Sequence, residues 1–219
     1  MLQSFLIDFL AELKANNNRE WFADNKAKYT QAKENFEAFI TQLIPQLWAL
    51  DDTFVHIKTQ DTLFRIYRDV RFSPNKDPYK TQFSAYFCKG GKNSQLAGYY
   101  LHIEPSNSFV GGGAYMPAAD LLKKIRQEID YNGEEFLQII ENKEFKNRFG
   151  EIEGEKLKTL PKGYTADNPT INFLKMKGFV ATCKFSDEQV LSENFDKQIA
   201  TSFFTMQPLI DFLNRAMKE

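Results

Sequence analysis

The sequence predicts a single α+β domain over residues 1–219. An antiparallel meander sheet of four to five strands carries helices packed on one face, with an N-terminal helix pair and a long C-terminal helix. Two observations support this fold class. Apolar residues recur at three- and four-residue steps near both ends of the chain, as in amphipathic helices. In the middle the period becomes two, and connectors rich in Gly, Pro and Asn join the segments, as in antiparallel strands.

The N-terminal helix pair is predicted from two apolar stripes. The first stripe covers residues 2–13, and the three Asn residues at 16–18 end it because Asn tolerates left-handed backbone geometry. A second helix is predicted over residues 19–43. Pro45 lacks a backbone N–H and is therefore expected to kink or end that helix.

The strands are predicted where apolar and polar residues alternate in segments bounded by residues typical of turns. The expected consecutive strands are residues 54–58, 62–72, 83–89, 97–104 and 108–114. Their connectors are too short for parallel crossovers, which need a dozen or more residues, so neighbouring strands are expected to pair antiparallel.

Helices return after Pro117, which suits a first helical position. A further helix is expected over residues 134–148, and short strands are candidates at 156–160 and 179–185. Ser186 and Gln189 have the spacing of a capping box. The last helix is expected to run to about Lys218, with a kink at Pro208.

Composition excludes several classes of protein. Lys and Arg number 28 against 29 Asp and Glu, so the whole chain has no general attraction to nucleic acid or to an anionic membrane. The 42% hydrophobic content is too high for a disordered chain. No apolar run approaches the roughly 18 residues of a membrane span, and the N-terminus lacks the features of a secretory signal. Two distant cysteines suit a reducing compartment, and we therefore expect a cytoplasmic protein.

Motifs for cofactors and metals are also missing from the sequence. It contains neither a Walker-type phosphate loop nor a dinucleotide-binding glycine pattern. Two cysteines and two histidines, without a metalloprotease motif, give no metal site by spacing. We expect neither a cofactor nor a metal.

The expected strand over residues 62–72 carries an unusual polar row. Because side chains alternate between faces, Arg65, Tyr67, Asp69 and Arg71 share one face. If the apolar sides of the strands share a core, the same face also receives other polar side chains, among them Tyr86, Tyr100, His102 and Glu104. Guanidinium groups bind phosphate or carboxylate through two parallel hydrogen bonds, so this face is a candidate anion site. The alternative is a solvated sheet surface, and the register between strands cannot be read from sequence.

Arg68 falls on the apolar side of the same segment. A buried guanidinium needs a carboxylate, several carbonyls or a ligand, unless a β-bulge turns it outward. A structural ion pair is the favoured interpretation.

We assign roles to these residues as expectations. Arg65 and Arg71 would hold the anion, and Tyr67 would orient it. Asp69 would position an arginine or act as a base, and His102 is the best candidate to carry a proton.

Two neighbouring segments could assist. Lys80 and Thr81 open the following strand and could reach the anion. Gly111, Gly112 and Gly113 either offer backbone N–H groups to an anion or mark a bend in a strand.

Motifs along nearly the whole chain resemble one protein family, domain of unknown function 2461. They lie at residues 16–22, 25–26, 29, 64–72, 78–81, 98–105, 111–113, 160–164, 169, 174–175 and 177–179. The resemblance implies no activity, cofactor or catalytic residue, because none is established for the family.

Three functions remain open. The first is a binding protein or enzyme that takes a small anionic ligand carrying phosphate or carboxylate. The second is a non-catalytic module for protein–protein interaction, because Arg and Tyr are favoured at the centres of such interfaces; no particular partner is indicated. Nucleic-acid binding is the weakest, because the tyrosine-bearing face has no basic excess.

Overall fold

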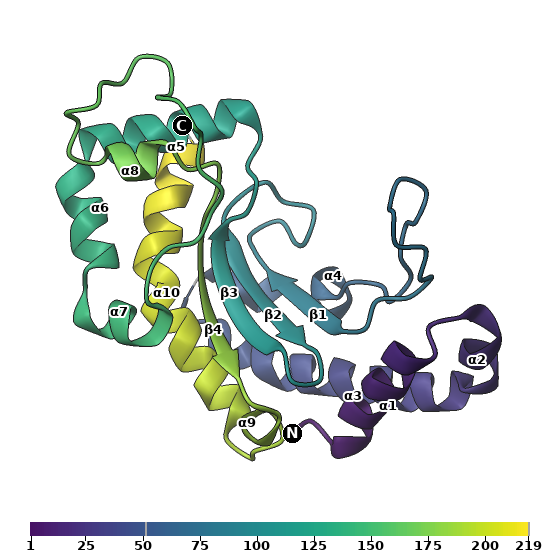
Figure 1. Ribbon diagram of the computed structural model, residues 1–219. Helices are drawn as coiled ribbons and strands as arrows, with labels where there is room; N and C mark the ends of the chain where they lie inside the picture. The colour runs from purple at the N-terminus through teal and green to yellow at the C-terminus, as the bar shows by residue number, and fades with distance from the viewer. Residues whose placement is uncertain (51, 219) are drawn as a thin grey trace. The chain divides into compact units, whose positions relative to one another are not determined.

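The computed structural model describes residues 1–50 and 52–218. It confirms the α+β class, with helices around one four-stranded antiparallel sheet. The strands are β1 (Phe83–Phe87), β2 (Gly98–Ile103), β3 (Ser108–Ala114) and β4 (Phe179–Phe185). They pair in the order β1-β2-β3-β4 (Figure 1). Three of the five expected consecutive strands are thus confirmed, and the fourth strand is the candidate at 179–185.

The helices flank the sheet in the sequence. They are α1 (Ser4–Ala15), α2 (Arg19–Asp24), α3 (Lys26–Leu43), η1 (Ile44–Leu47), η2 (Asp52–His56), α4 (Thr59–Thr62), α5 (Ala119–Tyr131), α6 (Gly133–Ile140), α7 (Lys143–Phe149), α8 (Ile171–Leu174), α9 (Asp187–Val190) and α10 (Phe195–Lys218). The elements η1 and η2 are 3-10 helices. Within the described residues, no helix is both long and apolar enough to cross a membrane.

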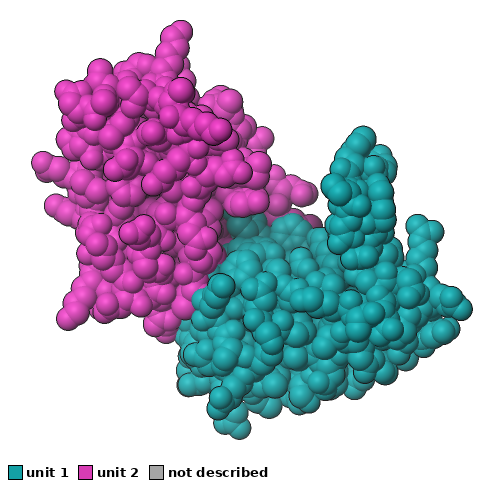
Figure 2. Space-filling view, in the orientation of Figure 1, with its two compact units in different colours: residues 1–87, 100–110, 184–200 teal, residues 88–99, 111–183, 201–219 magenta. Residues whose placement is uncertain are grey.

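The chain divides into two compact units, coloured teal and magenta in Figure 2. Unit 1 comprises residues 1–87, 100–110 and 184–200, and unit 2 comprises residues 88–99, 111–183 and 201–219. Each unit is therefore built from three segments of chain. The expectation of one domain over residues 1–219 stays a prediction.

Unit 1 has an aromatic core between helices and β1. Phe36 of α3 lies 5.4 Å from Phe83 of β1, ring centre to ring centre, and Phe9 of α1 lies 6.4 Å from the same ring. Phe39, three residues further along α3, stacks on Phe195. The alternating apolar residues of β1 therefore face the helices, as its sequence predicts.

Unit 2 has its own core around α10. Phe136 of α6 packs against Phe212 at 5.3 Å, and Tyr99 packs against Phe203 at 4.9 Å. Gly112 in β3 lets Met206 approach closely: a Cβ added there would lie 2.1 Å from the Met206 Sδ. The close packing of α10 on the strand depends on the missing side chain.

Two expected helices are each divided at an asparagine. The helix expected over residues 19–43 is α2 and α3, separated at Asn25, whose side chain donates to the Trp21 carbonyl. The helix expected over 134–148 is α6 and α7, and Asn142 caps α7 by accepting from the backbone N–H of Glu144 and Phe145. Asn side chains compete with the backbone for hydrogen bonds and so favour helix ends.

Two expected short strands are wrong. Residues 52–56 form the 3-10 helix η2, because an apolar–polar run this short fits a helical turn as well as a strand. Residues 156–160 contain only an isolated bridge between Lys156 and Met176. Glu153 bridges Val180 in the same way, so this loop covers the outer edge of β4 in unit 2.

The strand expected over residues 62–72 is also wrong. Its backbone pairs with neighbouring segments only at isolated bridges, Leu63 with Ala85 and Tyr67 with Tyr79. Pro78 accepts from the Arg68 N–H but has no N–H to return, so a continuous ladder cannot form. The alternating apolar residues of this segment do not form a buried face either, because Phe72 is 94% exposed. The segment covers the edge of β1 instead of extending the sheet.

Other terminal signals behave as the sequence predicts. Helix α3 ends at Leu43, two residues before Pro45. Ser186 and Gln189 form the capping box at the start of α9. Helix α10 runs to Lys218 as expected, with Pro208 inside it, and the kink at Pro208 stays a prediction.

Candidate functional site

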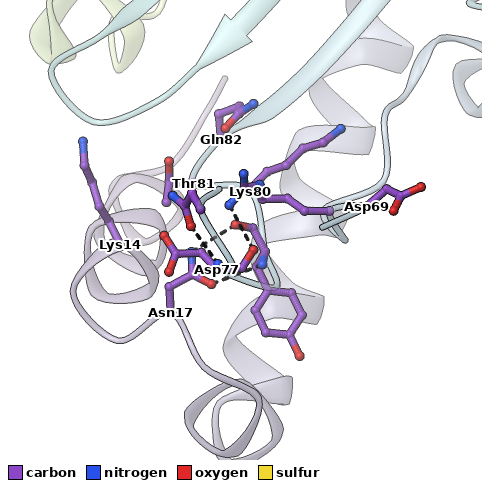
Figure 3. A pocket seen from close by; sticks show the side chains of 10 residues that line it. Lys14, Asn17, Asp69, Asp77, Lys80, Thr81 and Gln82 are labelled. Atoms are coloured by element: carbon purple, nitrogen blue, oxygen red, sulfur yellow. Dashed lines mark hydrogen bonds between the residues drawn. The ribbon is translucent and has the colours of Figure 1, made fainter. Parts of the chain in front are cut away.

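A pocket of about 540 Å³ lies within unit 1, at the loop that precedes β1. It is lined by Lys14, Asn17, Arg68, Asp69, Asn75, Asp77, Tyr79, Lys80, Thr81 and Gln82. In Figure 3, Lys14 and Asp69 lie at opposite ends of this group, with Thr81 and Asp77 between them. Three cationic side chains and two carboxylates line the pocket, so it has an excess of one positive charge.

Asn17 holds the wall of the pocket in place. Its Nδ2 donates to the Tyr79 carbonyl at 3.0 Å, and its Oδ1 accepts from the Tyr79 N–H at 3.2 Å. The Tyr79 ring stacks on Phe22 of α2, with ring centres 3.9 Å apart. The asparagine run that ends α1 therefore fixes residues 78–81, which are distant in sequence.

Arg68 forms hydrogen bonds to the loop that follows it. Its Nη1 donates to the Asp77 carbonyl at 3.0 Å, and its Nη2 donates to the Ser73 Oγ at 3.2 Å. None of the described carboxylates pairs with Arg68, so the favoured ion pair is wrong. The reason is the absent strand: Arg68 is not held in an apolar core, and carbonyl and hydroxyl oxygens suffice. A guanidinium has five N–H donors, so further donors stay available at the pocket.

Lys80 is the least compensated cation of the pocket. Its side chain is half-buried, and its Nζ lies 5.3 Å from the centre of the Phe64 ring. No carboxylate among residues 1–50 and 52–218 forms an ion pair with it. Burial lowers the pKa of the Lys80 ammonium, and the positive charge of Arg65 lowers it further. An anion in the pocket would relieve both effects.

Several of the predicted anion ligands lie outside the pocket lining. Arg71 is bound to Asp69, with Nη2–Oδ2 at 2.7 Å and Nε–Oδ1 at 3.0 Å, and its side chain is 76% exposed. The hydrogen bonds from Arg71 lower the pKa of the Asp69 carboxyl, which makes it a poor base. Arg65 is exposed, and Tyr67 packs edge-on against Phe22. Of the predicted set, the structure therefore groups Arg68, Asp69, Lys80 and Thr81.

The three predicted glycines are buried within β3 and do not line the pocket. Gly113 has φ +134°, and a Cβ there would lie 1.9 Å from the Phe179 carbonyl oxygen. Gly112 is the position under Met206, and Gly111 is buried beside it. Close packing accounts for Gly112 and Gly113 in this strand.

A row of polar side chains follows β2 on the face opposite the helices. The Tyr100 hydroxyl lies 3.1 Å from the His102 Nδ1, and the His102 Nε2 lies 3.3 Å from the Glu104 Oε2. His102 is only 8% exposed and stacks on Phe109. Burial lowers the pKa of His102, against the opposing effect of the Glu104 carboxylate. Near neutral pH the imidazole is therefore uncharged.

Glu104 connects this row with the lining of the pocket. Its Oε1 accepts from the Thr81 hydroxyl at 2.8 Å and lies 3.5 Å from the Lys14 Nζ, while Asn107 donates to its Oε2. Burial alone would raise the pKa of Glu104, but the hydrogen bonds from Asn107, Thr81 and His102 together lower it. Glu104 therefore stays a carboxylate.

Sequence reasoning missed six residues of the lining, Asn75 and Tyr79 of the loop before β1 and four others. Lys14, Asn17, Asp77 and Gln82 carry no spacing signal, because they come together through the fold of the chain. The Asn17 contact with Tyr79 spans 62 residues. Among the described residues, no group of three or more His, Cys, Asp or Glu side chains is placed to hold a metal ion.

The comparisons with known proteins give one match. A family model described as a conserved hypothetical protein, DUF2461, matches residues 6–212. Neither the curated proteins nor the solved structures provide a match.

Proposed function

The chain belongs to the DUF2461 family of conserved hypothetical proteins, and we propose that it binds a small anionic ligand, carrying phosphate or carboxylate, in the pocket of unit 1. Lys80 and Arg68 would bind the anion, and Lys14 would add positive charge at the other end. Asn17 would donate the one amide N–H that its bonds to the Tyr79 backbone leave over, whereas the Thr81 hydroxyl already donates to Glu104. This assignment moves the anion site from the Arg65–Arg71 pair to the cations that line the pocket.

The observation that supports this proposal is the state of Lys80. A half-buried ammonium without a carboxylate partner, repelled by Arg65, is unfavourable in the free protein. Groups with perturbed pKa values cluster at functional sites, and an anionic ligand would supply the opposite charge here. The neighbouring guanidinium of Arg68 still has unused donors, so two positive groups are ready at one pocket.

The experiment compares Lys80→Met with the native protein in a thermal-shift screen of inorganic phosphate, pyrophosphate, citrate and phosphorylated metabolites. A ligand present at about 100 times its Kd stabilises the native protein by roughly 2.7 kcal/mol. A hydrogen bond to a charged group contributes about 1.5–3 kcal/mol. We therefore expect Lys80→Met to weaken binding by about ten- to a hundredfold.

A second expected result concerns the free protein. Met removes the half-buried charge together with the contact between the Lys80 Nζ and the Phe64 ring. Because burial and Arg65 both disfavour that charge, Lys80→Met is expected to raise the melting temperature without ligand. Lys123→Met is the matched control, because Lys123 is exposed on α5 and does not line the pocket. The proposal fails if no anion stabilises the protein, or if Lys80→Met and Lys123→Met bind the anion equally well.

A second candidate function is a protein-interaction module. It is favoured by Phe72, which is 94% exposed beside Arg71. Stabilisation by an anion that depends on Lys80 would favour the pocket over this module. The proposed location is the cytoplasm, supported by two cysteines that are not joined in a disulfide.

A further inference from the structure

The hydrogen bonds of Tyr100, His102 and Glu104 have one consistent direction. A carboxylate only accepts, so the His102 Nε2 carries the proton and donates to Glu104. The His102 Nδ1 is then an acceptor, and the Tyr100 hydroxyl must donate to it. Ser84 in turn hydrogen-bonds to the Tyr100 oxygen. A hydroxyl, an imidazole base and a carboxylate that orients the base are thus joined in one chain of hydrogen bonds.

This is the arrangement of groups that activates a nucleophile. An imidazole that accepts the hydroxyl proton raises the reactivity of the oxygen, and the carboxylate fixes the tautomer of the imidazole. The row is also enclosed, because Tyr100 lies between Phe64 and Phe109, and the Tyr100 side chain is only partly exposed. Removal of water strengthens such charge interactions.

We propose that Tyr100, His102 and Glu104 form an acyl-transfer site, in which the Tyr100 oxygen attacks an electrophilic acyl compound such as an ester or thioester. His102 acts as the base, and Glu104 is a positioning residue. This inference does not depend on the anion-binding proposal, because none of the three side chains lines the pocket.

The step balances without any further reactant. The Tyr100 Oη–carbon bond forms while the bond from the acyl carbon to the alkoxide or thiolate breaks. The phenolic proton passes to the His102 Nδ1 and then to the leaving group. Water subsequently cleaves the tyrosyl ester: His102 accepts a proton from the water and passes it to the Tyr100 oxygen as the bond from that oxygen to the acyl carbon breaks. Burial raises the pKa of Tyr100, so little phenolate exists in advance and the reaction requires the base.

The test uses N-acetylimidazole as the acyl donor and mass spectrometry of peptides as the readout. Two tyrosines provide internal references, because Tyr115 is 79% exposed and Tyr131 is 73% exposed. We expect Tyr100 to be acetylated faster than both, despite its lower exposure. His102→Gln is expected to slow acetylation of Tyr100 by about a hundredfold or more, while the rates at the two references stay unchanged.

A second variant separates positioning from packing. Glu104→Gln keeps a hydrogen-bond acceptor at the same place but removes the charge, so we expect a smaller decrease in rate and a lower pKa of His102. In the native protein, nitrogen NMR should show the His102 proton on Nε2, with His56→Gln used to assign the signals. The proposal is overturned if Tyr100 reacts no faster than Tyr115, if folded His102→Gln reacts at the native rate, or if the proton lies on Nδ1.

Discussion

Acidification should destabilise the protein through His102. Burial holds the pKa of this imidazole below its usual value of 6.5. Between that lowered value and 6.5, the unfolded chain binds one more proton than the folded protein, so the free energy of unfolding falls as the pH falls. The stabilisation is fully present above about pH 6.5 and is lost as the pH decreases through the folded pKa.

The size of the effect follows from one proton. The free energy of unfolding should change by at most about 1.4 kcal/mol per pH unit within this range. The titratable groups that face His102 do not mask this pH dependence. Burial raises the pKa of Tyr100, and Glu104, which Lys14 also approaches, has a pKa lowered from 4.5. Neither changes charge between about pH 5 and pH 8.

The assay is urea unfolding at several pH values between about pH 5 and pH 8, for the native protein, His102→Gln and His56→Gln. The advantage in stability of the native protein over His102→Gln should decrease towards low pH. His56→Gln is the matched control, because it removes the other histidine of the sequence and leaves His102 in place. Parallel curves for the native protein and His102→Gln would refute the reasoning, as would a native advantage that grows on acidification.

Two further substitutions test how the fold is held. Gly113→Ala should lower the free energy of unfolding by about 3 kcal/mol or more, because its Cβ would meet the Phe179 carbonyl at 1.9 Å and its φ is +134°. Gly150 has φ +70° but open space around it, so Gly150→Ala should lower the free energy of unfolding by about 1–2 kcal/mol in the same urea assay. Equal costs would contradict the packing argument. Asn17→Ala should cost about 2 kcal/mol, because two hydrogen bonds to the Tyr79 backbone are lost, whereas exposed Asn93→Ala should change stability by less than about 0.5 kcal/mol. A cost for Asn17→Ala no larger than that for Asn93→Ala would show that the loop is held by other contacts.

The sheet was predictable where alternation coincides with burial. Strand β3 covers residues 108–114 and β4 covers residues 179–185, as the sequence indicates, while β2 is one residue shorter at each end than expected. In β2 the apolar side faces the core, with Leu101 and Ile103 fully buried. Period-two patterning is informative there because one face is in contact with helices and the other is not.

The pocket was only partly predictable. Lys80 and Thr81 could be selected because they follow a turn and open a strand. Lys14 lies in the last turn of α1 and Asn17 follows that helix, and their place in the lining depends on the contact between Asn17 and Tyr79. A hydrogen bond across 62 residues leaves no local pattern in the sequence. Only the structure shows that residues 78–81 dock on the asparagine run at residues 16–18 and so bring these side chains to the pocket.

The polar row of β2 and the polar row at residues 65–71 both show that strand pairing decides whether alternating side chains come together. Tyr100 and His102 alternate along a true strand and Glu104 follows it directly, so the backbone holds the three side chains at neighbouring positions. Arg65, Tyr67, Asp69 and Arg71 alternate in the same way, but their segment has no continuous ladder.

Without a ladder, local bonds decide where each side chain goes. Asp69 binds Arg71 two residues away, and Arg68 turns to the Asp77 carbonyl. Pro78 is the physical difference, because it removes the N–H that would have extended pairing between this segment and the residues before β1. A polar row therefore predicts a site only when its backbone partners can complete the sheet. By that criterion the β2 row is the better candidate for chemistry, and the pocket beside it is the better candidate for binding.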